Sequence, residues 1–110
     1  MSDRILTVAA TQFACGADQN KNADKAEELV REAAAKGAQV ILLQELFEAI
    51  YFCIEEDPTY FKWARPLEGH PLIARFANLA KELGVVLPIS YFEKAGQAHF
   101  NSIAIVDADG

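Results

Sequence analysis

The sequence has few of the residues that build several common kinds of protein. It contains only two cysteines, Cys15 and Cys53, and their spacing fits neither a zinc site nor the disulfide framework of a small secreted domain. No apolar run approaches the roughly 18–20 residues that cross a bilayer, and the first residues lack the apolar core of a signal peptide. We therefore expect a cytoplasmic protein without a membrane partner.

Positive charge is also scarce. Ten lysine and arginine residues stand against 16 acidic residues, which gives a formal net charge of −6. The basic residues are scattered, whereas a nucleic-acid-binding protein needs them clustered to displace counterions from phosphates. The first strand–helix loop also lacks the glycines of a phosphate-binding loop. The composition argues against a nucleic-acid partner and against a nucleotide-binding doubly wound domain.

What the sequence does have is apolar residues, 52% of the chain, which is enough to form a packed core. Short continuous apolar runs, typical of buried strands, alternate with stripes that repeat every three or four residues, typical of helices. We expect strands at 5–12, 39–43, 85–92 and 99–106, and helices at 22–36 and 71–83. Asn20 or Asn22 can cap the first helix, and Pro88 should occupy a bulge or an unpaired strand position.

The order β-α-β-α-β-β predicts an α/β fold, a mixed sheet with both helices on one face. The opposite face of so apolar a sheet needs a cover, and we expect no segment of this chain to supply one. Exposed apolar faces and unpaired edge strands bind partners. We therefore expect the isolated chain to self-associate, as a homo-oligomer formed through exposed sheet or helix surfaces.

Glu45 is the strongest candidate for a catalytic group. It follows the apolar run 40–43 and Gln44, at the carboxyl end of a predicted strand. Ligands of open α/β sheets collect outside such strand ends. A carboxylate that is partly removed from water there is a better base near neutral pH. The alternative is an ordinary surface glutamate at a strand–loop junction.

Aromatic residues fill the stretch that follows, from 47 to 68. A long loop beside a strand end is often functional, and we take Phe47, Tyr51 and Phe52 as candidate substrate-binding residues. Cys53 lies in the same stretch, but its neighbours are apolar or acidic and disfavour a thiolate. A packing role for Cys53 is therefore favoured over that of a nucleophile.

The other reactive side chains are isolated in the sequence. His70 and His99 have no partner at a metal-ligand spacing, so we expect structural or solvated roles and no metal site. Cys15 is interpreted as structural. Asn101 stands within a predicted strand where an apolar residue is usual, so we expect it to make a buried hydrogen bond.

These residues occur in the order of a known pattern, and the chain resembles the nitrilase superfamily of carbon–nitrogen hydrolases. That superfamily has a first strand ending in Ala-x-x-Gln, a helix ending in Gly-Ala, and a strand that delivers a glutamate before an aromatic residue. The matching segments here are Ala9-Ala10-Thr11-Gln12, Gly37-Ala38 and Leu42-Leu43-Gln44-Glu45-Leu46-Phe47. Many members have proline before the glutamate. Gln44 departs from that pattern but is similar to the N-carbamoylputrescine amidase branch, as are Phe47-Glu48, Tyr51-Phe52-Cys53, Ala64-Arg65-Pro66-Leu67-Glu68-Gly69 and Val85-Val86-Leu87-Pro88-Ile89-Ser90.

The resemblance implies an αββα sandwich, of which residues 1–110 form the amino-terminal part of an incomplete domain. It implies that Glu45 is the general base of a Glu-Lys-Cys triad. The cysteine attacks a small carbamoyl-amine or amide substrate, and the lysine stabilises the developing oxyanion. For N-carbamoylputrescine the products are putrescine, ammonia and carbon dioxide, a step of polyamine biosynthesis. No metal or organic cofactor is implied.

By resemblance, the lysine follows the last predicted hairpin and the nucleophilic cysteine comes later still. Lys94 and Cys53 fall at the wrong positions to replace them. We therefore expect the 110-residue chain to be inactive alone. Two alternatives stay open: another amidase of the superfamily, β-ureidopropionase-like or ω-amidase-like, and a non-catalytic interaction module or truncated remnant.

Overall fold

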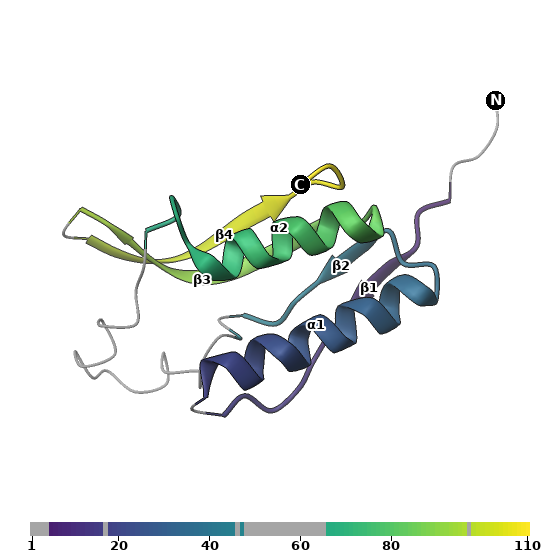
Figure 1. The fold of residues 1–110 in the computed structure, drawn as a ribbon, viewed down its shortest axis with the longest axis horizontal. Coiled ribbons are helices and arrows are strands. Elements are labelled where there is room, and N and C mark those ends of the chain that lie inside the picture. Colours follow the sequence, from purple (N-terminus) through teal and green to yellow (C-terminus); the bar gives the residue numbers. More distant parts are fainter. Residues whose placement is uncertain (1–4, 17, 46, 48–65, 97) are drawn as a thin grey trace.

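The structure, a computed structural model, describes residues 5–16, 18–45, 47, 66–96 and 98–110. These residues form strands β1 (Val8–Ala10), β2 (Val40–Leu42), β3 (Leu87–Ala95) and β4 (Ala98–Val106), and helices α1 (Gln19–Ala35) and α2 (Pro71–Leu83). The predicted order of elements is confirmed (Figure 1). The first two strands are shorter than predicted, because β1 pairs with β2 only over residues 8–10.

The four strands form two pairs, β1-β2 and β3-β4. β1 and β2 are parallel, with Val8 opposite Val40, and β3 and β4 are antiparallel. One parallel bridge between Val40 and Val86 joins the two pairs. There the backbone N–H of Val86 donates to the Gln39 carbonyl at 2.9 Å, and that of Ile41 donates to the Val86 carbonyl at 3.0 Å. Parallel and antiparallel pairing are both found, as predicted, but in two strand pairs that one bridge joins and not in a continuous four-stranded sheet.

Pro88 explains why this junction is short. Backbone N–H groups alternate sides along a strand, so the nitrogen of Pro88 faces the same neighbour as that of Val86, which is β2. Proline has no hydrogen to donate there. On its other side the ladder to β4 continues without a bulge, with Pro88 opposite Ile105. The predicted bulge is therefore not found at Pro88, and the residue is unpaired only on the side that faces β2.

Helix α1 begins after Asp18, whose carboxylate accepts hydrogen bonds from the backbone N–H groups of Asn20 and Lys21 at 3.0 and 3.2 Å. Asp18 is therefore the N-cap, in place of the predicted Asn20 or Asn22. Asn22 is buried and holds the preceding loop instead. Its amide donates to the Gly16 carbonyl at 2.8 Å, and its side-chain oxygen accepts from the Gly16 N–H at 2.9 Å.

Helix α2 has the predicted bounds because both of its ends are marked in the sequence. His70 precedes it, and the His70 Nδ1 atom accepts a hydrogen bond from the Leu72 N–H at 3.2 Å. Pro71 occupies the first turn, where no N–H is needed. Gly84 ends the helix in the left-handed conformation, with φ of 66°. Neither described helix has the length and apolar composition that crossing a membrane requires.

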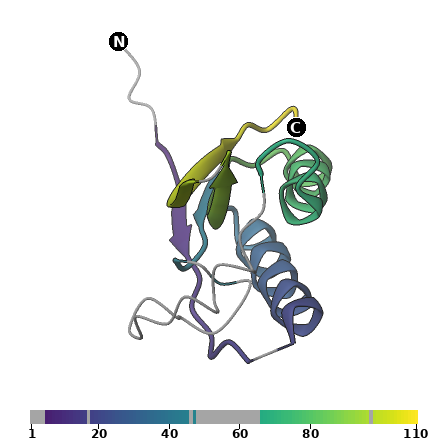
Figure 2. The same ribbon diagram turned by 90° about the vertical axis from the view of Figure 1, so that its left-hand side faces the viewer.

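Both helices cover the same face of the sheet (Figure 2), as predicted. Between them and the strands lies a core whose largest fully buried side chains are Phe47, Phe76, Ile41, Leu87, Ile89 and Val30. Burying each such side chain contributes roughly 1.5–3 kcal/mol. The opposite face, here called the open face, carries Val8, Leu42, Ile103 and Ile105, which are 65%, 47%, 58% and 64% exposed. The described residues therefore leave this apolar face uncovered.

Ion pairs join the outer surfaces of the two helices. The guanidinium of Arg75 on α2 lies 2.8 Å from Asp24 and 3.1 Å from Glu27 on α1. Arg31 on α1 reaches Glu27 at 3.1 Å and also pairs with Glu82 on α2. Partial burial of Glu27 favours its neutral form, but the hydrogen bonds and charges of the two arginines lower its pKa below the usual value.

Candidate active site

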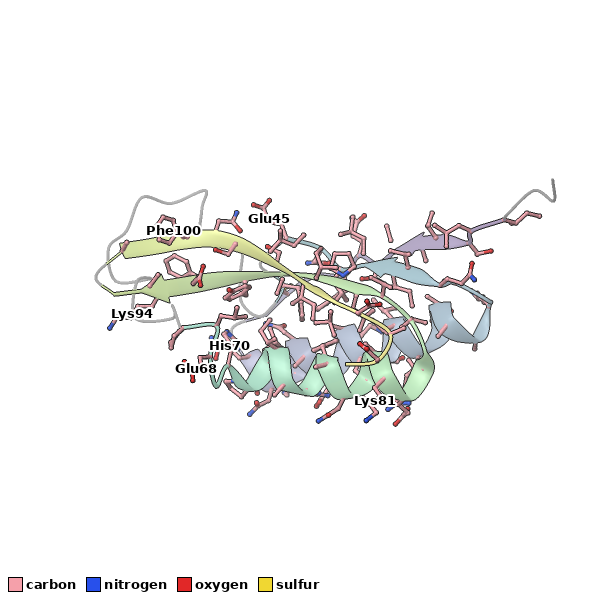
Figure 3. All side chains as sticks on the ribbon, turned by 90° about the horizontal axis from the view of Figure 1, so that it is seen from above. Glu45, Glu68, His70, Lys81, Lys94 and Phe100 are labelled. Atoms are coloured by element: carbon pink, nitrogen blue, oxygen red, sulfur yellow. The ribbon has the colours of Figure 1, made fainter. Side chains whose placement is uncertain are left out.

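Glu45 lies three residues beyond the end of β2, at the predicted carboxyl end of that strand. Its side chain lies on the side of the strands away from the helices (Figure 3). The side-chain amide of Asn101, on β4, donates a hydrogen bond from Nδ2 to Oε1 of Glu45. Two segments that are 56 positions apart in the sequence therefore meet at this carboxylate.

A third polar group continues this contact. The hydroxyl of Ser90, on β3, lies 3.3 Å from Oδ1 of Asn101 and donates to it. An ionised carboxylate only accepts hydrogen bonds, so the amide nitrogen of Asn101 faces Glu45 and its oxygen faces Ser90. The hydrogen bond predicted for Asn101 is present, but the prediction that it is buried is wrong, because the side chain of Asn101 is exposed.

The surroundings of Glu45 differ from those predicted. A pocket with little water was expected, but the Glu45 side chain is exposed. The physical reason is its place on the open face, which no described residue covers with a second layer. Glu45 therefore has the predicted position after β2, and it accepts a hydrogen bond from Asn101. The described residues do not shield its carboxylate from water.

Phe47 follows Glu45 by two residues and turns the other way. Its side chain is 0% exposed, and its ring meets that of Phe76 on α2 edge to face. This corrects the prediction of a substrate contact for Phe47, because its ring lies in the core under the helices. Tyr51, Phe52 and Cys53 lie outside the described residues.

The loop between β1 and α1 is hydrogen-bonded to the residues on both sides of Glu45. The N–H of Phe13 donates to Oε1 of Gln44 at 2.7 Å, and Nε2 of Gln44 donates to Sγ of Cys15 at 3.1 Å. The Cys15 thiol in turn donates to the Phe47 carbonyl at 3.1 Å. Sequence reasoning gave no role to Gln44, although a polar residue directly after a buried strand is a signal of such bonding.

Burial favours the protonated form of the Cys15 thiol. Burial raises the pKa of Cys15, and the hydrogen bond from Gln44 offsets only part of that rise. A protonated thiol is the form that donates to the Phe47 carbonyl. The structural interpretation of Cys15 therefore agrees with its contacts.

His70 and Lys94 lie apart from Glu45 (Figure 3). His70 is buried, caps α2, and meets the ring of Tyr91 edge to face with centroids 5.4 Å apart, so its predicted structural role is confirmed. Lys94 is exposed near the turn between β3 and β4. The side chain of His99 is not among those described.

Residues 7–110 match the family model of the carbon-nitrogen hydrolases, and the chain belongs to that family. N-carbamoylputrescine amidase of Solanum lycopersicum is 57% identical over 108 residues, covering 98% of this chain and 36% of that protein. A crystal structure of a carbon-nitrogen hydrolase from Helicobacter pylori G27 matches with a TM-score of 0.82 and 29% identity, over 94% of this chain and 36% of that one.

The fold is that of the nitrilase superfamily. The structure of Saccharomyces cerevisiae Nit3, a member of branch 10 of that superfamily, matches with a TM-score of 0.76 and 20% identity, over 96% of this chain and 41% of that one. The chain spans about a third of the length of the relatives it matches, 36% for the tomato protein. The described strands and helices therefore correspond to part of a longer chain of this fold.

Proposed function

We propose that this chain forms the amino-terminal part of an enzyme that hydrolyses N-carbamoylputrescine to putrescine, ammonia and carbon dioxide. The observation that carries the proposal is Glu45, a hydrogen-bonded carboxylate at the carboxyl end of β2, where the sequence resembles the catalytic glutamate segment of the superfamily. The identity of 57% to the tomato N-carbamoylputrescine amidase supports the choice of substrate.

In the proposed reaction Glu45 takes the proton of a cysteine thiol. By resemblance, that cysteine and an oxyanion-stabilising lysine come from the rest of the enzyme. The thiolate attacks the ureido carbonyl carbon, and the C–N bond to the terminal amino group breaks. Glu45 returns the proton, so ammonia leaves. Water then cleaves the carbamoyl thioester, which restores the thiol and gives a carbamic acid that loses carbon dioxide to form putrescine.

The test uses a hybrid enzyme, in which residues 1–110 of this chain are joined to the remaining part of the tomato relative. Ammonia release from N-carbamoylputrescine is measured for the hybrid, for its Glu45→Gln variant and for the tomato enzyme. We expect the hybrid to turn over and Glu45→Gln to lower kcat by about 10²–10⁴-fold, the usual contribution of a general base. A folded hybrid whose kcat is unaffected by Glu45→Gln would contradict the proposal.

The matched control is Glu93→Gln. Glu93 is a carboxylate of β3 that accepts a hydrogen bond from the Ser102 hydroxyl at 2.8 Å, on the helix-covered face of the sheet. Its replacement removes the same charge as Glu45→Gln, but on the face away from Glu45. We expect kcat of Glu93→Gln to stay within about twofold of the parent, as for substitutions outside the reacting groups.

The purified 110-residue chain gives a separate test. We expect no ammonia release from it, because it supplies only one member of the triad. Turnover above background by this chain would contradict that expectation. The cytoplasmic location and the homo-oligomer stay predictions, and equilibrium sedimentation of the hybrid enzyme tests the second of them.

A further inference from the structure

Three polar side chains on three strand segments form a chain of hydrogen bonds that ends on Glu45. Ser90 belongs to β3, Asn101 to β4, and Glu45 follows β2. Ser90 donates to Oδ1 of Asn101 at 3.3 Å, and Nδ2 of Asn101 donates to Oε1 of Glu45. Alternation along the strands places Ser90 and Asn101 on the open face, since Leu87, Ile89 and Val106 face the core.

This chain fixes which way the amide of Asn101 points. A hydroxyl could donate or accept, but the carboxylate can only accept, so the amide must offer its nitrogen to Glu45. The amide oxygen is then left for the Ser90 hydroxyl, and the two contacts require the same orientation. Both partners of Asn101 therefore hold its N–H toward the carboxylate.

A hydrogen bond donated to a carboxylate favours the ionised form over the neutral acid. Only the ionised form can accept a proton as a general base. Among the described residues, Asn101 makes the one side-chain hydrogen bond to Glu45, and it engages a single oxygen, Oε1. This contact fixes the rotation of the carboxylate, with Oε2 left to take the proton.

We propose that Asn101 is a positioning residue for Glu45, with Ser90 orienting the Asn101 amide. This inference rests on the proposed role of Glu45 as a general base. Asn101 does not touch the reacting atoms and acts through the carboxylate. Its replacement should therefore lower kcat with little effect on KM.

The activity test uses Asn101→Leu and Asn101→Asp in the hybrid enzyme. Asn101→Leu removes the donor, and loss of a hydrogen bond to a charged group predicts a fall in kcat of about 10–100-fold. Asn101→Asp keeps the shape but places a second negative charge beside Glu45, so kcat should fall at least as far. Asn101→Gln restores an amide and should recover part of kcat.

Ser102→Ala is the matched control. Ser102 is the next residue on β4, and its hydroxyl donates to the carboxylate of Glu93 at 2.8 Å on the opposite face of the sheet. Ser102→Ala therefore removes a hydrogen bond to a carboxylate, as Asn101→Leu does, one residue further along β4. We expect kcat of Ser102→Ala to stay within about twofold of the parent. An equal loss of kcat in Ser102→Ala and Asn101→Leu would overturn the proposal.

A second measurement tests the contact between Asn101 and Glu45 without relying on enzyme activity. In the hybrid enzyme labelled with ¹⁵N-asparagine, the side-chain amide resonance of Asn101 should shift as pH falls and the carboxylate takes up a proton. Glu45→Gln should abolish that shift. An Asn101 resonance that titrates identically in Glu45→Gln would overturn the inference. An inactive hybrid that still shows the coupling would defeat the proposed function and leave the positioning contact supported.

Discussion

The ring of Phe47 meets the ring of Phe76 edge to face, with centroids 5.5 Å apart and planes crossing at 72°. This contact ties the segment that carries Glu45 to helix α2. On the other side of Glu45, Gln44 is held by the loop between β1 and α1. The carboxylate is therefore presented on the open face from a backbone that is anchored in the core before and after it.

Phe76→Ala should weaken this anchor strongly. Both aromatic rings are fully buried, and removing one leaves a cavity that costs about 3–5 kcal/mol of unfolding free energy. The denaturant midpoint of the hybrid enzyme should fall accordingly. Phe100→Ala is the control, because Phe100 is 50% exposed and should change the unfolding free energy by about 0.5 kcal/mol or less. Equal midpoints for the two variants would refute the anchoring role.

Cys15 should react slowly with iodoacetamide at neutral pH. Burial raises the pKa of its thiol, so the thiolate forms only at higher pH than in a small exposed thiol such as glutathione. Labelling of the Cys15 peptide, followed by mass spectrometry across pH 6–11, gives the midpoint. Gln44→Ala removes a hydrogen bond that favours the thiolate and should move the midpoint higher still. A lower midpoint in Gln44→Ala would show that the hydrogen bond from Gln44 does not favour the thiolate.

Ionised Glu27 should stabilise the folded protein, and this stabilisation should be lost in acid. Partial burial opposes its ionisation, but Arg31 and Arg75 outweigh this and lower its pKa on folding. The resulting stabilisation is complete above the unfolded carboxyl pKa, about 4.3, and is lost as pH falls through the lower folded value. Because the pairs are partly exposed, we expect Glu27→Gln to cost about 0.3–1 kcal/mol at pH 7.

Thermal unfolding of the parent and Glu27→Gln between pH 2 and 7 checks this expectation. The two melting temperatures should differ at neutral pH and converge at the acidic end. Glu28→Gln is the control, since Glu28 is exposed and pairs only with Lys25 at 3.6 Å among the described residues. A difference that grows toward low pH would contradict the sign of the Glu27 shift.

The isolated 110-residue chain should self-associate through the open face. Ile103 and Ile105 are exposed there beside Val8 and Leu42, and an apolar face of this kind binds other apolar surfaces. Replacing Ile103 and Ile105 together by lysine should shift size-exclusion elution toward the monomer. Leu67→Lys, at a leucine 47% exposed but outside the strands, should not. A parent chain that elutes as a sharp monomer and melts cooperatively would count against this prediction.

The sequence was sufficient for the features that depend on near neighbours. The bounds of α2 followed from Pro71 and Gly84, because a first-turn proline and a left-handed glycine each act within one turn. The position of Glu45 at the end of β2 followed from the apolar run before it. The cap of α1 was misplaced by two residues or more, since three neighbouring polar residues could each have served and only Asp18 has the required geometry.

The features that were missed depend on distant partners. Nothing local tells that Asn101 meets Glu45 across 56 positions, because that contact is created by the pairing of β4 with β3 and by the bridge that joins this pair to β2. Nor does the sequence near Phe47 tell whether its ring turns toward the core or toward the open face. The exposure of Glu45 depends on the layer that lies over the open face, which no pattern within these residues describes.

The junction at Val40 and Val86 separates Glu45 from the amide that binds it. The carboxylate follows β2, whereas Asn101 and Ser90 belong to the hairpin of β3 and β4 on the other side. Between these halves the described strands share one backbone bridge, and on the helix side the arginine ion pairs hold them together. The alignment of Glu45 with Asn101 therefore depends on how these two halves are held together, by the shared core and by the ion pairs on the outer surfaces of the helices.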